Sequence, residues 1–174
     1  MGVELLETSR LRLRPFARDD VDALHAQWTE PDVLRYLWDG VVIAREQAAA
    51  IVEESIASFA ARRFGMWVLV TKEDERLVGF SGLRPIPERT EVELYYGLSR
   101  AYWRRGFATE AARAVLRYGF QVVGLDPIYV RTDGPNVESV AVMKRLGARY
   151  LRTDATGSFG TTLVHVVRSK DFAR

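Results

Sequence analysis

The spacing of apolar residues changes several times along the chain, and each spacing predicts a different element. Residues 9–16 alternate leucine with arginine and end on phenylalanine, which predicts a strand with one solvated face. Apolar side chains recur at helical spacing over residues 18–28 and 44–63, so two amphipathic helices are expected there. Pro31 is expected to close the first helix, because proline cannot continue one. Residues 34–40 are then predicted to form an aromatic connection between the two helices.

After residue 63 the pattern becomes mostly strand-like. Residues 65–72 and 76–83 predict an antiparallel hairpin that turns at 73–75, and residues 90–98 predict a third strand. The remaining segments are a helix at 106–120, a strand at 127–132, a helix at 136–147 and strands at 149–153 and 161–168. The order β-α-α-β-β-β-α-β-α-β-β predicts an α+β domain, with helices on the faces of one mixed sheet.

The composition is that of one soluble domain. The chain has 174 residues, 48% of them hydrophobic and 28% charged, and this length predicts a single domain over residues 1–174. It contains no cysteine, which excludes disulfides and any cysteinyl intermediate. The formal charge is only +2, without one long basic run, which argues against a nucleic-acid partner. No apolar run approaches the roughly 20 residues of a membrane span, and the first ten residues lack the layout of a secretory signal. A cytoplasmic protein without a membrane partner is therefore expected.

Several common catalytic motifs are missing from the sequence. Residues 79–82 read GFSG, similar to a hydrolase elbow, but Leu83 stands where that motif needs a second glycine. No P-loop or dinucleotide fingerprint occurs. His25 and His165 are far apart and fall in different predicted elements, so no metal site is expected.

The stretch WRRGFATEAA, residues 103–112, has the features of an anion-binding loop. It lies where a helix is expected to begin, and a helix N-terminus offers unpaired backbone N–H groups and positive potential. Gly106 lets a ligand approach the main chain, Arg104 and Arg105 add positive charge, and Thr109 adds a hydroxyl. The alternative is a surface loop with solvated arginines and a capping threonine.

A second segment favours the anion-binding interpretation over the surface loop. DGPNVESVAVMKRLGARY, residues 133–150, places Asn136 and Ser139 at the start of another helix after a strand. ELYYGLSRAYWRRGFATEA, residues 93–111, resembles the strand–loop–helix with which the GNAT superfamily of N-acetyltransferases binds the pyrophosphate of coenzyme A. The later segment resembles the next helix and strand of that family. The opening SRLRLRPFARDDVDAL…EPDVLRYL is similar to its ribosomal-protein N-terminal acetyltransferase branch, the RimJ/RimL-like group.

The resemblance runs over nearly the whole chain and implies a fold and a cofactor. The fold would be a mostly antiparallel sheet of about seven strands flanked by four helices, splayed between the fourth and fifth strands. The co-substrate would be acetyl-CoA, with no metal. The cofactor-binding residues implied are Tyr96, Gly97, Leu98, Arg104, Arg105, Gly106, Phe107, Ala108, Thr109 and Asn136. The family loop usually begins with glutamine or arginine where this chain has Trp103, so the backbone amides of residues 104–109 would do most of the binding.

The resemblance also implies roles around the pantetheine and the thioester. The main chain at residues 96–98 would pair with the pantetheine amides as an added strand does. Asn136 would bond the pantetheine from the other side, although it also suits a helix N-cap. Glu93 is the candidate base, acting directly or through water, and its alternative is a glutamate on the solvated face of a strand. Ser139 would donate a proton to the departing thiolate, or would simply cap or solvate its helix.

The acceptor is expected over the first two helices and the late strand connection. Tyr36, Trp38 and Asp39 come from the first region, and Asp154 and Phe159 from the second. Aromatic rings and acids suit a cationic amine, and they suit core and surface equally well.

Because the chain has no cysteine to carry the acyl group, we expect direct attack by an amine in a ternary complex. The acceptor would be a protein or peptide N-terminal α-amine, or a small-molecule amine. The alternative function is a non-catalytic module that binds or senses acyl-CoA. An exposed strand edge near the C-terminus would permit a homodimer.

Overall fold

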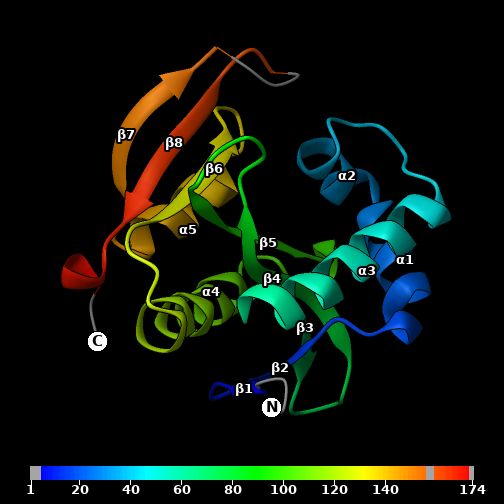
Figure 1. Cartoon of the computed structure of the whole chain (residues 1–174). Coiled ribbons are helices and arrows are strands. Elements are labelled where there is room, and N and C mark those ends of the chain that lie inside the picture. The colour runs from blue at the N-terminus through cyan, green and yellow to red at the C-terminus, as the bar shows by residue number, and fades with distance from the viewer. Residues whose placement is uncertain (1–4, 156–158, 173–174) are drawn as a thin grey trace.

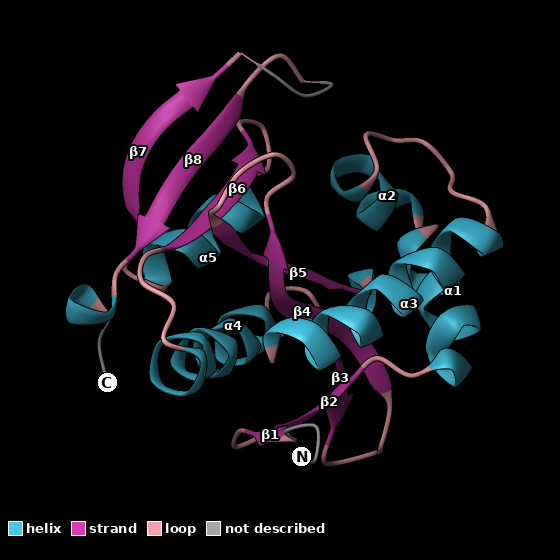
Figure 2. Ribbon diagram, viewed as in Figure 1, coloured by secondary structure: helices cyan, strands magenta, loops and turns pink. Residues whose placement is uncertain are grey.

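The protein is described by a computed structural model that covers residues 5–155 and 159–172, and these form one sheet flanked by helices (Figures 1 and 2). The eight strands are β1 (Leu6–Glu7), β2 (Leu11–Pro15), β3 (Met66–Thr71), β4 (Leu77–Pro85), β5 (Val92–Leu98), β6 (Ile128–Asp133), β7 (Arg149–Asp154) and β8 (Thr162–Val167). The five α-helices in the described residues are α1 (Val21–Trp28), α2 (Pro31–Leu37), α3 (Arg45–Arg62), α4 (Phe107–Tyr118) and α5 (Val137–Arg145). The α+β class predicted from the sequence is confirmed, with one more short strand, β1, and one more helix, α2.

The sheet has the order β1-β2-β3-β4-β5-β6-β8-β7, and its neighbours are antiparallel except β5 and β6. These two strands pair in parallel only at Glu93 with Tyr129 and at Leu94 with Val130. Beyond these two pairs β5 continues to Leu98 without pairing to β6. The splay between the fourth and fifth predicted strands is therefore confirmed, and it leaves β5 main-chain groups unpaired on that side.

Strand alternation divides the buried residues between the two faces of the sheet. One core lies under α4, where Leu94 of β5 packs with Val115. The other lies under α1 and α3, where Phe80 of β4 packs with Leu24. Successive β5 residues point to opposite faces, so the site can draw on both.

The helix α2 corrects a sequence prediction. Pro31 was expected to close the first helix, but α1 already ends at Trp28 and Pro31 occupies the first turn of α2. Proline fits there because its fixed φ suits a helix and its missing N–H would have no partner in the first turn. The bond from the Leu34 N–H to the Glu30 carbonyl, 2.8 Å, then starts the helix.

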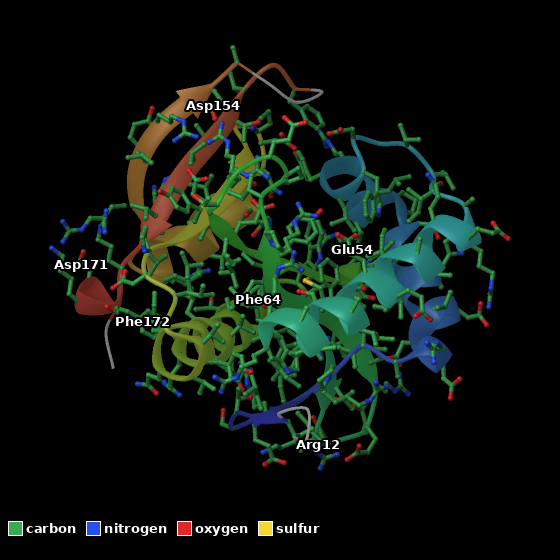
Figure 3. The ribbon with its side chains drawn as sticks, in the orientation of Figure 1. Arg12, Glu54, Phe64, Asp154, Asp171 and Phe172 are labelled. Carbon is green, nitrogen blue, oxygen red and sulfur yellow. The ribbon has the colours of Figure 1, made fainter. Side chains whose placement is uncertain are left out.

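The periphery is polar and the middle is apolar. Phe64, just after α3, is 4% exposed and lies near the centre of the molecule in Figure 3, whereas Arg12 and Asp171 lie at its edges. No described helix is both long and apolar enough to cross a membrane.

Candidate active site

A cleft of about 1570 Å³ opens at the splay and brings most of the predicted site together. Its walls come from α2, β4, β5, β6, α4, α5 and the loop before α4. The predicted residues that line it are Tyr36, Asp39, Glu93, Tyr96, Gly97, Leu98, Arg104, Gly106, Ala108, Thr109, Asn136 and Ser139. One continuous space therefore joins the predicted cofactor loop to the predicted acceptor residues.

Two residues of the predicted cofactor loop keep their side chains out of the cleft lining. Phe107 is 8% exposed and packs into the core under α4. Arg105 places its guanidinium 5.3 Å from the ring centre of Tyr102. These two positions can therefore contribute to the loop through their main chain, not through their side chains.

The loop before α4 has the backbone that an anion site needs. Gly106 caps the helix with φ +81°, a conformation that strains any residue with a Cβ. A Cβ there would lie 3.3 Å from Nη2 of Arg10. The Thr109 hydroxyl oxygen is buried and has no hydrogen-bond partner among the described residues. A buried hydroxyl without a partner fits a site that receives a polar group, and beside a helix N-terminus that group would be an anion.

Glu110 fixes this loop to the N-terminal strands. Its carboxylate accepts from Nε of Arg10 at 2.7 Å, from the Arg10 backbone N–H at 2.9 Å and from the Thr8 hydroxyl at 2.6 Å. Burial alone would raise the pKa of Glu110, but these donors lower it. The Nη1 group of Arg10 also donates to the Arg105 carbonyl at 2.9 Å, so the loop is held from both ends.

The predicted loop arginine Arg104 spans the cleft. Its Nη2 lies 2.6 Å from Oε1 of Glu138, so an exposed ion pair joins the loop to α5. A phosphate in the loop would compete with Glu138 for this guanidinium.

A hydrogen-bonded pair connects β5 to α5. The Tyr96 phenol oxygen lies 2.8 Å from the Ser139 hydroxyl oxygen. Burial raises the pKa of Tyr96 to about 12, so the phenol stays protonated at neutral pH. Asn136 accepts the Ser139 backbone N–H at 3.1 Å, so it is the N-cap of α5 and also faces the cleft.

Glu93 is buried and doubly paired. It is 2% exposed, so the alternative of a solvated glutamate is wrong. Oε1 accepts from Nε of Arg84 at 2.8 Å and from Nη2 of Arg131 at 2.9 Å, and Oε2 accepts from Nε of Arg131 at 2.6 Å. Burial alone would raise the pKa of Glu93, but the two arginines outweigh burial and lower it. The group is therefore ionised, and it is a weak base.

The predicted acceptor residues divide into two groups. Tyr36 and Asp39 line the cleft, together with Asp133, which the sequence analysis did not select. Burial, and then the charge of Asp39, raises the pKa of Asp133. Neither aspartate has an ion-pair partner in the described part of the chain.

The other acceptor candidates support the wall. The Trp38 ring packs 5.8 Å from the Trp28 ring, and the Phe159 ring lies 5.3 Å from that of Tyr36. Asp154 pairs with Arg152 at 2.8 Å. None of these three side chains lines the cleft.

Comparison with known proteins identifies the family. The family described as acetyltransferase (GNAT) domain matches residues 10–149. The chain belongs to the GNAT acetyltransferases. It is 31% identical over 149 residues to the uncharacterized N-acetyltransferase p20 of Bacillus licheniformis, covering 83% of this chain and 82% of that protein. It is 27% identical over 137 residues to a spermidine N(1)-acetyltransferase of Escherichia coli, covering 79% of this chain and 72% of that protein.

Solved structures share the GNAT fold. A GNAT-family acetyltransferase from Bacillus anthracis aligns with TM-score 0.81 at 22% identity, covering 96% of this chain and 99% of that one. RimL, a ribosomal alpha-N-protein acetyltransferase in complex with coenzyme A, aligns with TM-score 0.81 at 16% identity, covering 95% of this chain and 98% of that one. At these identities the likeness establishes the fold. The GNAT domain makes this chain an acyl-CoA-dependent acetyltransferase.

The sequence analysis did not select several arginines that line the cleft of this acetyltransferase. Arg113 and Arg117 of α4 and Arg145 of α5 line the same cleft as Thr109. Arg113 and Arg117 follow Thr109 at intervals of four, which puts them on one helix face. That spacing was the available signal, and it extends the positive wall along α4.

Proposed function

We propose that this acetyltransferase transfers acetyl from acetyl-CoA to a primary amine by direct attack in a ternary complex. The acceptor is an N-terminal α-amine or a small-molecule amine. One observation carries the proposal: a single cleft is lined by the loop before α4 with its buried Thr109 hydroxyl, by the half-buried Tyr96–Ser139 hydroxyl pair, and by two carboxylates without an ion-pair partner among the described residues. Both substrates can then be present together, and no enzyme-bound acyl group is required.

The cradle suits the cofactor. The backbone N–H groups of residues 104–109 and the Thr109 hydroxyl would hold the pyrophosphate, because a helix N-terminus favours negative charge. The β5 main chain at residues 96–98 would pair with the pantetheine, since it has no strand partner on the β6 side. Asn136 would face the pantetheine from α5.

The Tyr96–Ser139 pair suits the leaving group. Collapse of the tetrahedral intermediate expels a thiolate that needs a proton or a hydrogen-bond donor. Ser139 would donate to the sulfur, and the Tyr96 phenol, which stays protonated, would hold that hydroxyl in place.

The weak base Glu93 favours an acceptor that is already partly neutral. An α-amine with pKa near 8 is about 10% neutral at pH 7, whereas a lysine amine near 10.4 is only ~0.04% neutral. Deprotonation of the α-amine is therefore about 3 kcal/mol easier. Glu93, with its pKa lowered, would take that proton through water, while Asp39 and Asp133 attract the ammonium form into the cleft.

Thiol release from acetyl-CoA tests the proposal. The panel comprises amino acids, N-terminal peptides, lysine peptides, polyamines and aminoglycosides. The protein has no thiol of its own to raise the background. We expect release with α-amines. A flat response across the panel by protein that binds acetyl-CoA would contradict the acceptor proposal, and loss of acetyl-CoA binding would contradict the cradle.

A further inference from the structure

Three charged side chains meet on the acceptor face of the sheet, beside the point where β5 and β6 separate. Arg84 of β4 is the cross-strand partner of Glu93 on β5, and Arg131 lies on β6. All three line the cleft. The only carboxylate among them is buried, and the side chains of Arg84 and Arg131 are 40% and 32% exposed.

The charges and hydrogen bonds of this cluster do not balance. Arg131 donates to Glu93 from both Nε and Nη2, whereas Arg84 donates only from Nε. Beyond Glu93, Arg84 interacts with the Tyr95 hydroxyl, and it has no second carboxylate partner among the residues that the structure describes. Asp154 is also near Arg131, but it is paired with Arg152. The cluster therefore has one excess positive charge, on Arg84.

The guanidinium of Arg84 is held in one orientation. Its central carbon lies 3.5 Å from the centre of the Tyr95 ring, while Glu93 holds its Nε. The Tyr95 phenol donates to the Leu37 carbonyl at 3.4 Å, which fixes the ring on which Arg84 rests. A guanidinium that is already stacked and oriented loses little freedom when its open edge binds an anion.

We propose that Arg84 binds a carboxylate of the acceptor, so that the acceptor is an amino carboxylic acid. This inference rests on the proposed function. A carboxylate matches the single excess charge and can accept both terminal N–H groups of a guanidinium. Cross-strand neighbours lie about 5 Å apart, so Arg84 is a short step from the last β5–β6 pair, where the thioester would lie. A carboxylate one or two carbons from the amine fits that distance.

The test compares each amino acid with the amine that it would give on decarboxylation. Leucine is paired with isopentylamine, and phenylalanine with phenethylamine. The measured quantity is the ratio of kcat/KM for the acid to that for its amine, in wild type, Arg84→Gln and Arg84→Lys. Because the two amines differ in pKa, each variant's ratio is divided by the wild-type ratio, which removes that difference. Arg89→Gln, an exposed arginine of the same hairpin without a place in the cleft lining, is the matched control.

We expect Arg84→Gln to lower the ratio about tenfold to a hundredfold, the usual range for losing charge-assisted bonds to one ion. Arg84→Lys should fall between Arg84→Gln and wild type, and Arg89→Gln should match wild type. An effect of Arg84→Gln that acted only through the basicity of Glu93 would slow both members of a pair equally and leave the ratio constant. An unchanged ratio in Arg84→Gln would overturn this inference while the proposed function stood. The same would follow if wild type had a higher kcat/KM for the carboxylate-free amines than for the amino acids, once each value is corrected for the fraction of neutral amine. If no amine of the panel is acetylated, the proposed function and this inference both fail.

Discussion

The Tyr96 phenol oxygen lies 2.8 Å from the Ser139 hydroxyl oxygen, which joins the splayed strand β5 to the first turn of α5. Both residues line the cleft. Since the proposed transfer needs a donor at the departing sulfur, these two hydroxyls should act as one unit.

Tyr96→Phe and Ser139→Ala should each lower kcat about tenfold, a modest share of what general acid catalysis contributes. The double variant should be no slower than the slower single variant, because residues that act as a unit are not additive. Single-turnover rates and the Kd of acetyl-CoA measure this, and Kd should stay within about twofold of wild type. Tyr129→Phe, a tyrosine of β6 outside the cleft lining, is the control. Additive losses would show that the pair does not work together.

Thr109→Val should separate stability from cofactor binding. Removing a buried hydroxyl that has no partner should raise the free energy of unfolding by about 1 kcal/mol. The Kd of acetyl-CoA should rise roughly tenfold, since a bond to a charged phosphate is lost. Urea unfolding and calorimetric titration give the two quantities, and Thr109→Ser, which keeps the hydroxyl, should bind as wild type does. Unchanged affinity in the valine variant would remove Thr109 from the cofactor site.

Glu138→Gln should tighten cofactor binding. The change frees Arg104 and removes a negative charge beside the proposed pyrophosphate site, so Kd should fall about two- to threefold at low salt. The gain should shrink in high salt, which screens exposed charges. The free energy of unfolding should change by less than about 0.5 kcal/mol, because surface ion pairs contribute little to stability. Glu54→Gln, at an exposed position of α3 outside the cleft lining, should change neither the Kd nor the free energy of unfolding. Weaker binding in Glu138→Gln would mean that the ion pair holds the loop in its binding conformation.

Glu93→Gln should destabilise the protein by about 2 kcal/mol at neutral pH, because it leaves two arginines without their carboxylate. The folded-state pKa of Glu93 is below its ordinary value of 4.5. The stabilisation is therefore complete above that value and is lost as pH falls through the lowered pKa. In urea unfolding, the difference in free energy of unfolding between wild type and variant should narrow as pH falls below about 4.5. Glu91→Gln, two residues earlier, is the control variant, and a pH-independent difference for Glu93→Gln would contradict the ionic origin.

The sequence predicted the order of the elements well because apolar spacing is local. It missed α2 because a proline can end one helix or begin the next, and only the Leu34–Glu30 hydrogen bond distinguishes the two. The two-residue strand β1 is too short to show any alternation. It is defined by its pairing with β2 alone.

The residues of the proposed cofactor loop could be selected from the sequence, whereas those of the proposed acceptor face could not. Residues 103–112 are contiguous, so their chemistry appears in one short stretch. Arg84, Glu93 and Arg131 come from three strands and meet only through the register of the sheet. Alternation could place Glu93 on a face, but its burial depends on an arginine 38 residues later. Single arginines in strands carry no signal of such a meeting.

The two residue pairs between β5 and β6 make a weak seam between a five-stranded block and a three-stranded one. A ligand that lies along the open part of β5 and also contacts α5 would add contacts between the two blocks where strand pairing is missing. The free energy of unfolding then depends on the ligand concentration, and it rises by about 2.7 kcal/mol when that concentration is a hundred times Kd. Amides of β7, at the outer edge of the three-stranded block and outside the cleft lining, would exchange their hydrogens more slowly together with those of β5. The gap between β5 and β6 that admits the substrate is thus also the place where bound substrate connects the two blocks of the sheet.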